Sequence, residues 1–176
     1  MLGTGGTIGR EARLGGALLF LAALQFVGAM VLVQLEYPGY SDWANYVSDL
    51  GNPVHSPGAA LFNGSIELLG LLTIVSAVLL RGAFARGPSG RLGRLTLALA
   101  ALFALLVGLF PENSTALGGH LHGIVSDGTF LFSGLALLLL GVAMLGDPRW
   151  PVYGFYTLLS GIVTFLAIEL VVVNSN

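Results

Sequence analysis

Residues 108–128 read GLFPENSTALGGHLHGIVSDG. This stretch ends one apolar segment, turns after a proline, and begins a second apolar segment. Its polar and ionisable side chains stand out in a chain that has few of them: Glu112, Asn113, His120, His122, Ser126 and Asp127. The pattern indicates two consecutive helices joined by a polar turn, and the turn is the first place to look for a functional site.

Apolar residues dominate the whole chain. Of its 176 residues, 55% are hydrophobic and 9% are charged, and the mean hydropathy is +0.87. Soluble domains carry about 25% charged residues, so lipid must cover much of this surface. Five segments are long enough to cross the hydrocarbon core as helices, at about 14–35, 58–80, 92–110, 119–145 and 151–173. The sequence predicts an all-α fold: a polytopic transmembrane helical bundle that forms a single domain over residues 1–176.

Two residue types are missing. The chain has no cysteine, which excludes disulfides, thiolate nucleophiles and cysteine metal sites. It has no lysine, which excludes a Schiff base and therefore a retinal cofactor. Nothing in the charge pattern supports a nucleic-acid partner, whereas membrane lipids are expected partners of so apolar a chain.

The arginines predict the orientation. They lie before the first segment, between the second and third, and between the fourth and fifth: Arg10, Arg13, Arg81, Arg86, Arg91, Arg94 and Arg149. Loops rich in arginine stay in the cytoplasm. The N-terminus is therefore expected in the cytoplasm, and the loops 36–57 and 111–118 are expected to face outward.

The outward loop 36–57 contains the sequence YSDWANYVSDLG at 40–51. We expect a short amphipathic helix near 41–50, lying along the membrane surface. Helical spacing would put Asp42, Asn45 and Asp49 on one side of it. Trp43, Val47 and Leu50 would lie on the other side.

Acidic residues inside the predicted helices all fall in the outer half of the membrane, at Glu67, Asp127 and Glu169. An acid in hydrocarbon is costly and usually faces the interior of a bundle. Asn63, one turn before Glu67, is either its hydrogen-bond partner or part of the same pocket. Because the inner half holds no ionisable group, a proton or ion pathway across the whole membrane is not expected.

These residues predict one site opening outward, formed by Asp49, Glu112, His120 and Asp127 with Glu67 as its floor. Further pocket residues are Asn45, Asn63, Glu67, His122 and Ser126. Three kinds of chemistry fit. His120, Asp49 and Glu112 can bind a divalent metal. His120, Asp127 and Asp49 can serve as catalytic acid and base. Ser126 can act as a nucleophile if His122, one turn before it, is its base. The alternative is a hydrogen-bonded cluster that only fixes helix packing.

The pattern favours recognition or processing of a lipid or small polar ligand, with or without a metal. One alternative is an accessory or structural subunit of a larger membrane complex. Another is a small transporter, which the apolar inner half disfavours.

Several motifs resemble a known family. NYVSDLG at 45–51, the Phe62-Asn63 pair, GLFPE at 108–112 and the following His120 are similar to the prokaryotic membrane proteins of domain of unknown function family 998. A fainter similarity connects this pattern to the eukaryotic Frag1/DRAM/Sfk1 membrane proteins, some of which are linked to lipid and GPI-anchor handling. The resemblance implies a helical bundle in a prokaryotic plasma membrane, with no established activity.

Members of the family typically have six helices, whereas five are found here. The resemblance therefore implies either a shortened sequence, or a homo-oligomer or partner helix that completes the bundle.

Overall fold

The computed structural model describes residues 9–84 and 87–174, with backbone alone for 171–174. It contains five long helices: α1 Arg10–Glu36, α2 Ala59–Leu79, α3 Pro88–Leu109, α4 Leu121–Leu145 and α5 Pro151–Asn174. Three short 3-10 helices lie in the connections: η1 Val47–Gly51, η2 Leu80–Gly82 and η3 Ala116–Gly119. No strand occurs in the described ranges. Each long helix has the length and composition to cross a membrane. The predicted all-α, multi-pass architecture is confirmed.

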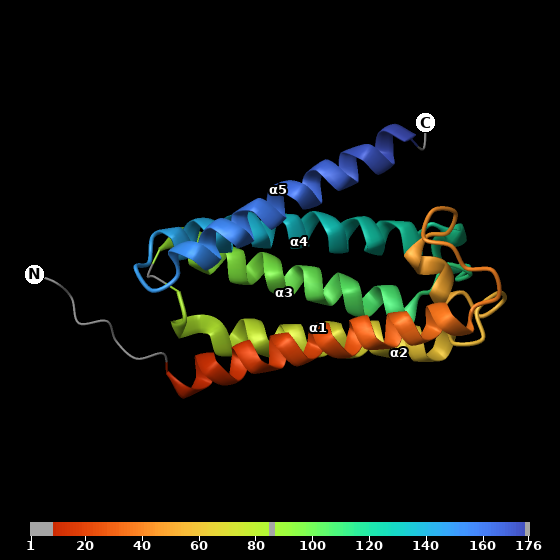
Figure 1. The fold of residues 1–176 in the computed structure, drawn as a ribbon, viewed down its shortest axis with the longest axis horizontal. Coiled ribbons are helices and arrows are strands. Elements are labelled where there is room, and N and C mark those ends of the chain that lie inside the picture. The colour runs from red at the N-terminus through yellow and green to blue at the C-terminus, as the bar shows by residue number, and fades with distance from the viewer. Residues whose placement is uncertain (1–8, 85–86, 175–176) are drawn as a thin grey trace, which may run out of the picture.

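The long helices run up and down along the long axis of the molecule (Figure 1). Each packs mainly on its neighbours in the chain, α1 on α2, α2 on α3, α3 on α4, and α4 on α5. The C-terminal half of α5 leans away from the rest of the bundle (Figure 1). The arrangement is therefore an open row in which α1 and α5 are the outer members, rather than a closed ring of helices.

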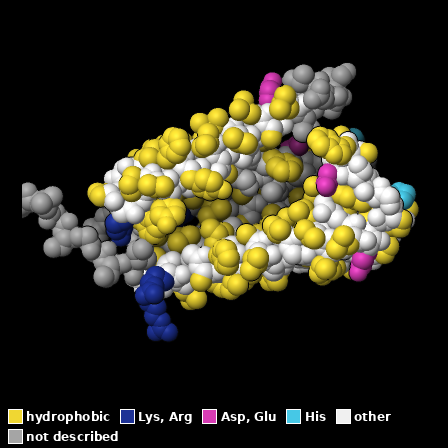
Figure 2. All heavy atoms as spheres, in the orientation of Figure 1, with side chains coloured by type: hydrophobic (Ala, Val, Ile, Leu, Met, Phe, Trp, Pro, Cys, Tyr) yellow, Lys and Arg dark blue, Asp and Glu magenta, His cyan; other side chains and the backbone are white. Residues whose placement is uncertain are grey.

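Small side chains fill the contacts between helices, while large apolar ones face outward. The buried apolar residues are mostly alanines, among them Ala22, Ala29, Ala100, Ala101, Ala104, Ala136 and Ala143. Large exposed apolar side chains occur on every long helix, including Phe20, Leu71, Leu102, Phe130 and Phe155. Figure 2 shows this apolar surface along the length of the molecule. Helices in lipid associate by close packing of small residues, which explains the pattern.

The two ends of the bundle differ in charge. Arginine side chains are seen at the end where α1 begins, and acidic and histidine side chains gather toward the opposite end (Figure 2). We call these the basic end and the acidic end. The predicted orientation puts the basic end in the cytoplasm and the acidic end outside.

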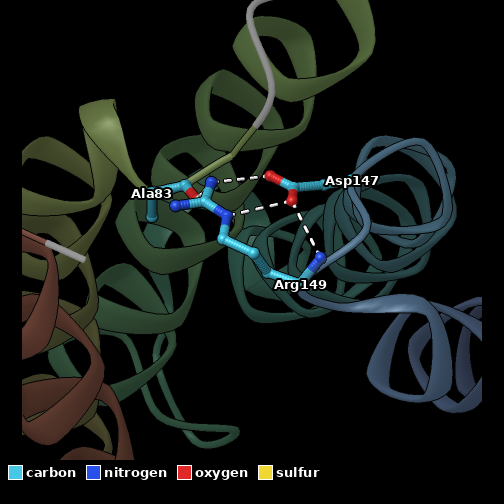
Figure 3. A network of polar contacts seen from close by, with 3 residues as sticks. All are labelled: Ala83, Asp147 and Arg149. Carbon is cyan, nitrogen blue, oxygen red and sulfur yellow. Dashed lines mark hydrogen bonds and ion pairs between the residues drawn. The ribbon is translucent and has the colours of Figure 1, made fainter. Parts of the chain in front are cut away.

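An ion pair ties two loops together at the basic end (Figure 3). Asp147, in the α4–α5 turn, is buried. Arg149 donates from Nη2 to Asp147 Oδ2 at 2.6 Å and from Nε to Asp147 Oδ1 at 2.9 Å. The same Nη2 donates to the backbone oxygen of Ala83, just after η2, at 3.1 Å. This ion pair therefore links the α4–α5 turn to the end of the α2–η2 segment.

The segment 41–50 does not form the single amphipathic helix that its spacing predicts. Residues 42–44 form a turn, and only Val47–Gly51 is helical, as the 3-10 helix η1. Trp43 is fully exposed whereas Leu50 is fully buried, so these two side chains do not share a face. The reason is local: the Ser41 N–H donates to Asn45 Oδ1, and the Tyr46 N–H donates to Asp49 Oδ2. Such side-chain bonds compete with the backbone bonds of a helix.

Candidate functional site

The 3-10 helix η1 positions the Asp49 carboxylate. Asp49 Oδ2 accepts a hydrogen bond from Asn45 Nδ2 at 2.9 Å and from the Tyr46 N–H at 3.1 Å. Asn63 on α2 donates from Nδ2 to the backbone oxygen of Gly51 at 2.9 Å. The loop is thus fastened to α2 immediately after Asp49. This fixes the carboxylate at the acidic end of the bundle.

Glu112 follows the end of α3 and faces the same loop. Its carboxyl group lies close to the Asp49 carboxyl group and to the Asn52 side chain, and close enough to His122 for electrostatic interaction. Partial burial and the neighbouring Asp49 carboxyl group raise the pKa of Glu112 above its ordinary value, while Asn52 and His122 oppose the shift. Two carboxyl groups in contact favour sharing one proton.

His122 lies in the first turn of α4 and is held by the end of α3. Its Nδ1 is 2.8 Å from the backbone oxygen of Phe110. A carbonyl oxygen only accepts, so Nδ1 carries the proton, and in the neutral ring Nε2 is then the acceptor. Ser126 Oγ lies 3.4 Å from that Nε2. The predicted i, i+4 pairing of His122 and Ser126 is thus present, although the contact is long.

We call Asp49, Asn52, Glu112 and His122 the carboxyl cluster. It draws on η1 and the residue after it, the α3–α4 turn and the start of α4. Asn45 and Asn63 support it through the hydrogen bonds to Asp49 and Gly51. Of the five residues expected to converge, the structure brings Asp49 and Glu112 into direct contact.

The other predicted members lie elsewhere. The side chain of His120 is exposed and forms no hydrogen bond or ion pair within the described part of the chain, and Asp127 is exposed on α4. His122 occupies the place expected for His120. Glu67 is half-buried and packs against α3, since a side chain at Gly108 would meet Glu67 Cγ at 2.6 Å. Asp42, expected beside Asn45 and Asp49, instead accepts a hydrogen bond from Gln34 Nε2 at 3.0 Å.

The residues expected to hold a metal do not form a ligand set. Within the described ranges, no group of three or more His, Asp or Glu side chains is arranged to hold a metal ion. Among the described residues, the His120 side chain forms no ion pair with Asp49 or Glu112. The expected acid–base set of His120, Asp127 and Asp49 likewise makes no mutual hydrogen bond in the described part of the chain.

Sequence reasoning missed one member of the cluster. Asn52 is not among the residues that the sequence singles out, yet its side chain interacts with Glu112. The sequence carries no signal for this contact, because the two residues are 60 positions apart in the chain. For His122 the sequence offers only a weak indication of a role in the site, namely its i, i+4 spacing to Ser126.

Comparison with protein families shows which family the chain belongs to. Residues 20–175 match the family model described as protein of unknown function DUF998. The chain belongs to this family. The match confirms the resemblance carried by the NYVSDLG and GLFPE motifs, both of which contribute to the carboxyl cluster. Comparisons with curated proteins and with solved structures gave no significant match, so the fainter similarity to the Frag1/DRAM/Sfk1 proteins gains no support.

The raised pKa of Glu112 gives a prediction about stability and pH. A carboxyl group whose pKa is raised by folding stabilises the protein below its unfolded pKa, and this contribution disappears as pH rises through the folded pKa. Glu112→Gln keeps a donor for Asp49 at every pH. We expect the melting temperature of the wild type to fall relative to that of Glu112→Gln as pH rises above about 4.5.

The measurement is a series of thermal melts in detergent across that pH range. Asp42→Asn serves as the control, because it removes an exposed carboxylate from the same end of the bundle. It should follow the wild-type curve. Parallel pH profiles for wild type and Glu112→Gln would contradict the shared-proton interpretation.

Proposed function

We propose that this integral membrane protein recognises a lipid headgroup or small polar ligand carrying an ammonium group, and that the carboxyl cluster binds it. The observation that carries the proposal is the closeness of two carboxyl groups, Asp49 and Glu112, at an end of the bundle where no arginine lies.

Electrostatics supports a cationic ligand. The loops at the acidic end contain Asp42, Asp49 and Glu112, with Glu36 at the end of α1. The arginines that the structure describes lie at the other end, in the first turn of α1, in η2, in the first two turns of α3 and in the α4–α5 turn. Neither Asp49 nor Glu112 forms an ion pair within the described chain. Close carboxylates without a compensating charge repel each other, and a bound cation would relieve that repulsion.

Protonation of Glu112 provides an exchange with the ligand. At low pH, a proton on Glu112 relieves the repulsion from Asp49, as a ligand cation would do. An arriving ammonium group would release that proton and donate hydrogen bonds to both carboxylates. Asn52 and His122 provide further polar groups at the same place. Binding should therefore strengthen as pH rises through the pKa of Glu112.

The surroundings support a headgroup as the source of that ammonium. The cluster lies just beyond the ends of membrane-spanning helices. Trp43 and Tyr46, in the same loop, are exposed. Amphipathic aromatic rings settle at the level of lipid headgroups.

Recognition has better support than processing. Among the described residues of the site, only Ser126 and His122 form a nucleophile–base pair, and their contact is long. No group of described side chains could hold a metal ion that would assist a reaction. Neither feature is needed for binding a cation. We therefore assign no reaction to the cluster.

The test is binding of ethanolamine, and of phosphatidylethanolamine in phosphatidylcholine nanodiscs, to the purified protein. We expect Asp49→Asn to weaken binding about tenfold, as expected for the loss of one charge-assisted contact. Asp42→Asn is the matched control, with the same change on the same loop outside the cluster, and should alter affinity less than about twofold.

Equal losses of affinity in the two variants would refute the proposal, since a general negative surface potential would then be enough to explain the binding. Binding of free ethanolamine without preference for the lipid would identify a soluble amine as the ligand. Absence of binding to either probe would contradict the function.

A second candidate is an accessory subunit of a membrane complex. The observation that favours it is the open row of helices, in which α1 makes no substantial contact with α4 or α5 among the described residues. A partner helix or a second copy of the chain could pack on that face. If the protein has only this role, Asp49→Asn should not weaken binding of ethanolamine or phosphatidylethanolamine, so the same experiment separates the two candidates.

A further inference from the structure

A cavity at the basic end has no role in the proposed function. It has a volume of about 500 Å³ and is lined by Arg81, Phe84, Gly87, Pro88, Gly90, Arg91 and Arg94. These residues come from η2, the segment after it and the first two turns of α3. The cavity therefore lies at the opposite end of the helices from the carboxyl cluster, in a separate part of the molecule (Figure 1).

Two of its three arginines have no acidic partner. Arg81 is paired with Glu11, at 3.0 Å between Nη2 and Oε2, and both side chains are exposed. Arg91 and Arg94 form no ion pair within the described residues. The only other acid in the segments at this end is Asp147, which is buried against Arg149. The positive charge around the cavity is thus largely uncompensated.

The spacing of Arg91 and Arg94 suits a single anionic group. Residues three apart on a helix lie on neighbouring positions of one face, and both side chains line the same cavity. Guanidinium groups bind phosphate oxygens with paired N–H donors. Arg91 is exposed and Arg94 is half-buried, so both guanidinium groups can reach such a group in the cavity.

We infer that this cavity binds the phosphate group of an anionic phospholipid. The apolar walls at Phe84 and Pro88 and the position at the ends of membrane-spanning helices favour a phospholipid over a soluble phosphate. Basic pockets between membrane helices hold anionic headgroups in the same way. The inference does not depend on the function proposed for the carboxyl cluster.

The experiment is competition between phosphatidylglycerol and phosphatidylcholine for the purified full chain, measured by native mass spectrometry. The wild type should prefer phosphatidylglycerol. The double variant Arg91→Gln/Arg94→Gln should bind it about 30-fold more weakly, as expected for removing two charges near the membrane surface. The matched control Arg10→Gln/Arg13→Gln removes two arginines from the same end, outside the cavity, and should change affinity less than about threefold.

A wild type without preference for phosphatidylglycerol overturns the inference. So does an equal loss in the two double variants, because attraction to the surface as a whole would then explain binding. Inorganic phosphate is the second probe. If it binds the wild type as tightly as phosphatidylglycerol does, the site takes a soluble phosphate and the lipid assignment is wrong.

Arg91→Lys/Arg94→Lys keeps the charge and covers the case in which the glutamine variant fails to fold. It should bind phosphatidylglycerol more weakly than the wild type, since lysine lacks the paired N–H donors of arginine. Wild-type affinity in this variant would contradict recognition by the guanidinium groups.

Discussion

Gly70→Val should lower the free energy of unfolding by about 3 kcal/mol, the upper part of the range for overpacking a tight contact. Gly70 is buried where α2 crosses α3. A Cβ atom at this position would lie 2.6 Å from the backbone oxygen of Ala101 and 2.8 Å from the backbone nitrogen of Leu105. Because both atoms belong to the backbone of α3, no side-chain rotation can make room, and the two helices must separate.

The matched control is Gly64→Val on the same helix. No atom lies within 4 Å of a Cβ built at Gly64, so the same substitution meets open space there. We expect a change of less than about 0.5 kcal/mol. Unfolding in mixed micelles with increasing SDS gives both values. Equal destabilisation by the two substitutions would show that the loss arises from the backbone of α2 and not from its contact with α3.

Asp147→Asn should have the second largest effect, lowering the free energy of unfolding by about 2 kcal/mol. The side chain of Asp147 is 6% exposed and accepts hydrogen bonds from Arg149 through both carboxylate oxygens (Figure 3). Asparagine keeps the shape but loses the charge and one acceptor. Arg149 would then also hold the Ala83 oxygen less firmly, which loosens the link between the two loops at the basic end.

The effect of Asp147→Asn should depend on pH. The hydrogen bonds from Arg149 hold the pKa of Asp147 below its ordinary value of 3.8. The stability contributed by a carboxylate with a lowered pKa is present above its unfolded pKa and is lost as pH falls through the folded pKa. Wild type and variant should therefore differ most near neutral pH and converge in acid.

Glu11→Gln is the control for this second prediction. It breaks the other ion pair of the described chain, Glu11 with Arg81, in which both side chains are more than half exposed. An exposed pair contributes about 0–1 kcal/mol, so the change should be small. If Asp147→Asn costs no more than Glu11→Gln in the same SDS titration, the buried ion pair does not stabilise the loops.

Length and hydropathy determined the helices. All five long helices match the predicted segments to about one turn at each end. A helix that crosses lipid must satisfy its backbone hydrogen bonds within itself, so a long apolar segment leaves no alternative structure. The family relationship could also be read from the sequence, because its motifs are contiguous runs.

Local hydrogen bonds determined the conformation of the 41–50 segment, which does not form the helix that its spacing predicts. The spacing of Asp42, Asn45 and Asp49 was compatible with a helix, but the short side chains of Asn45 and Asp49 bond the backbone of their own loop. Spacing describes which residues would share a face if the helix formed. It does not tell whether polar side chains will take the place of the helical backbone bonds.

Tertiary structure alone decided which histidine joins the carboxyl cluster. α4 begins at Leu121, with His120 as its N-cap, after a turn in which Leu117, Gly118 and Gly119 have positive φ. His120 and Asp127 are both exposed, whereas His122 is half-buried. That turn sets the rotation of α4 against α3 and brings His122 to the Phe110 oxygen and to Glu112. The sequence by itself determined the five helices and the gathering of polar residues at the acidic end, because apolar length and loop order are local properties. The contacts of Asp49, Asn52, Glu112 and His122 depend on how separate segments are rotated and fastened, and only the folded chain decides that.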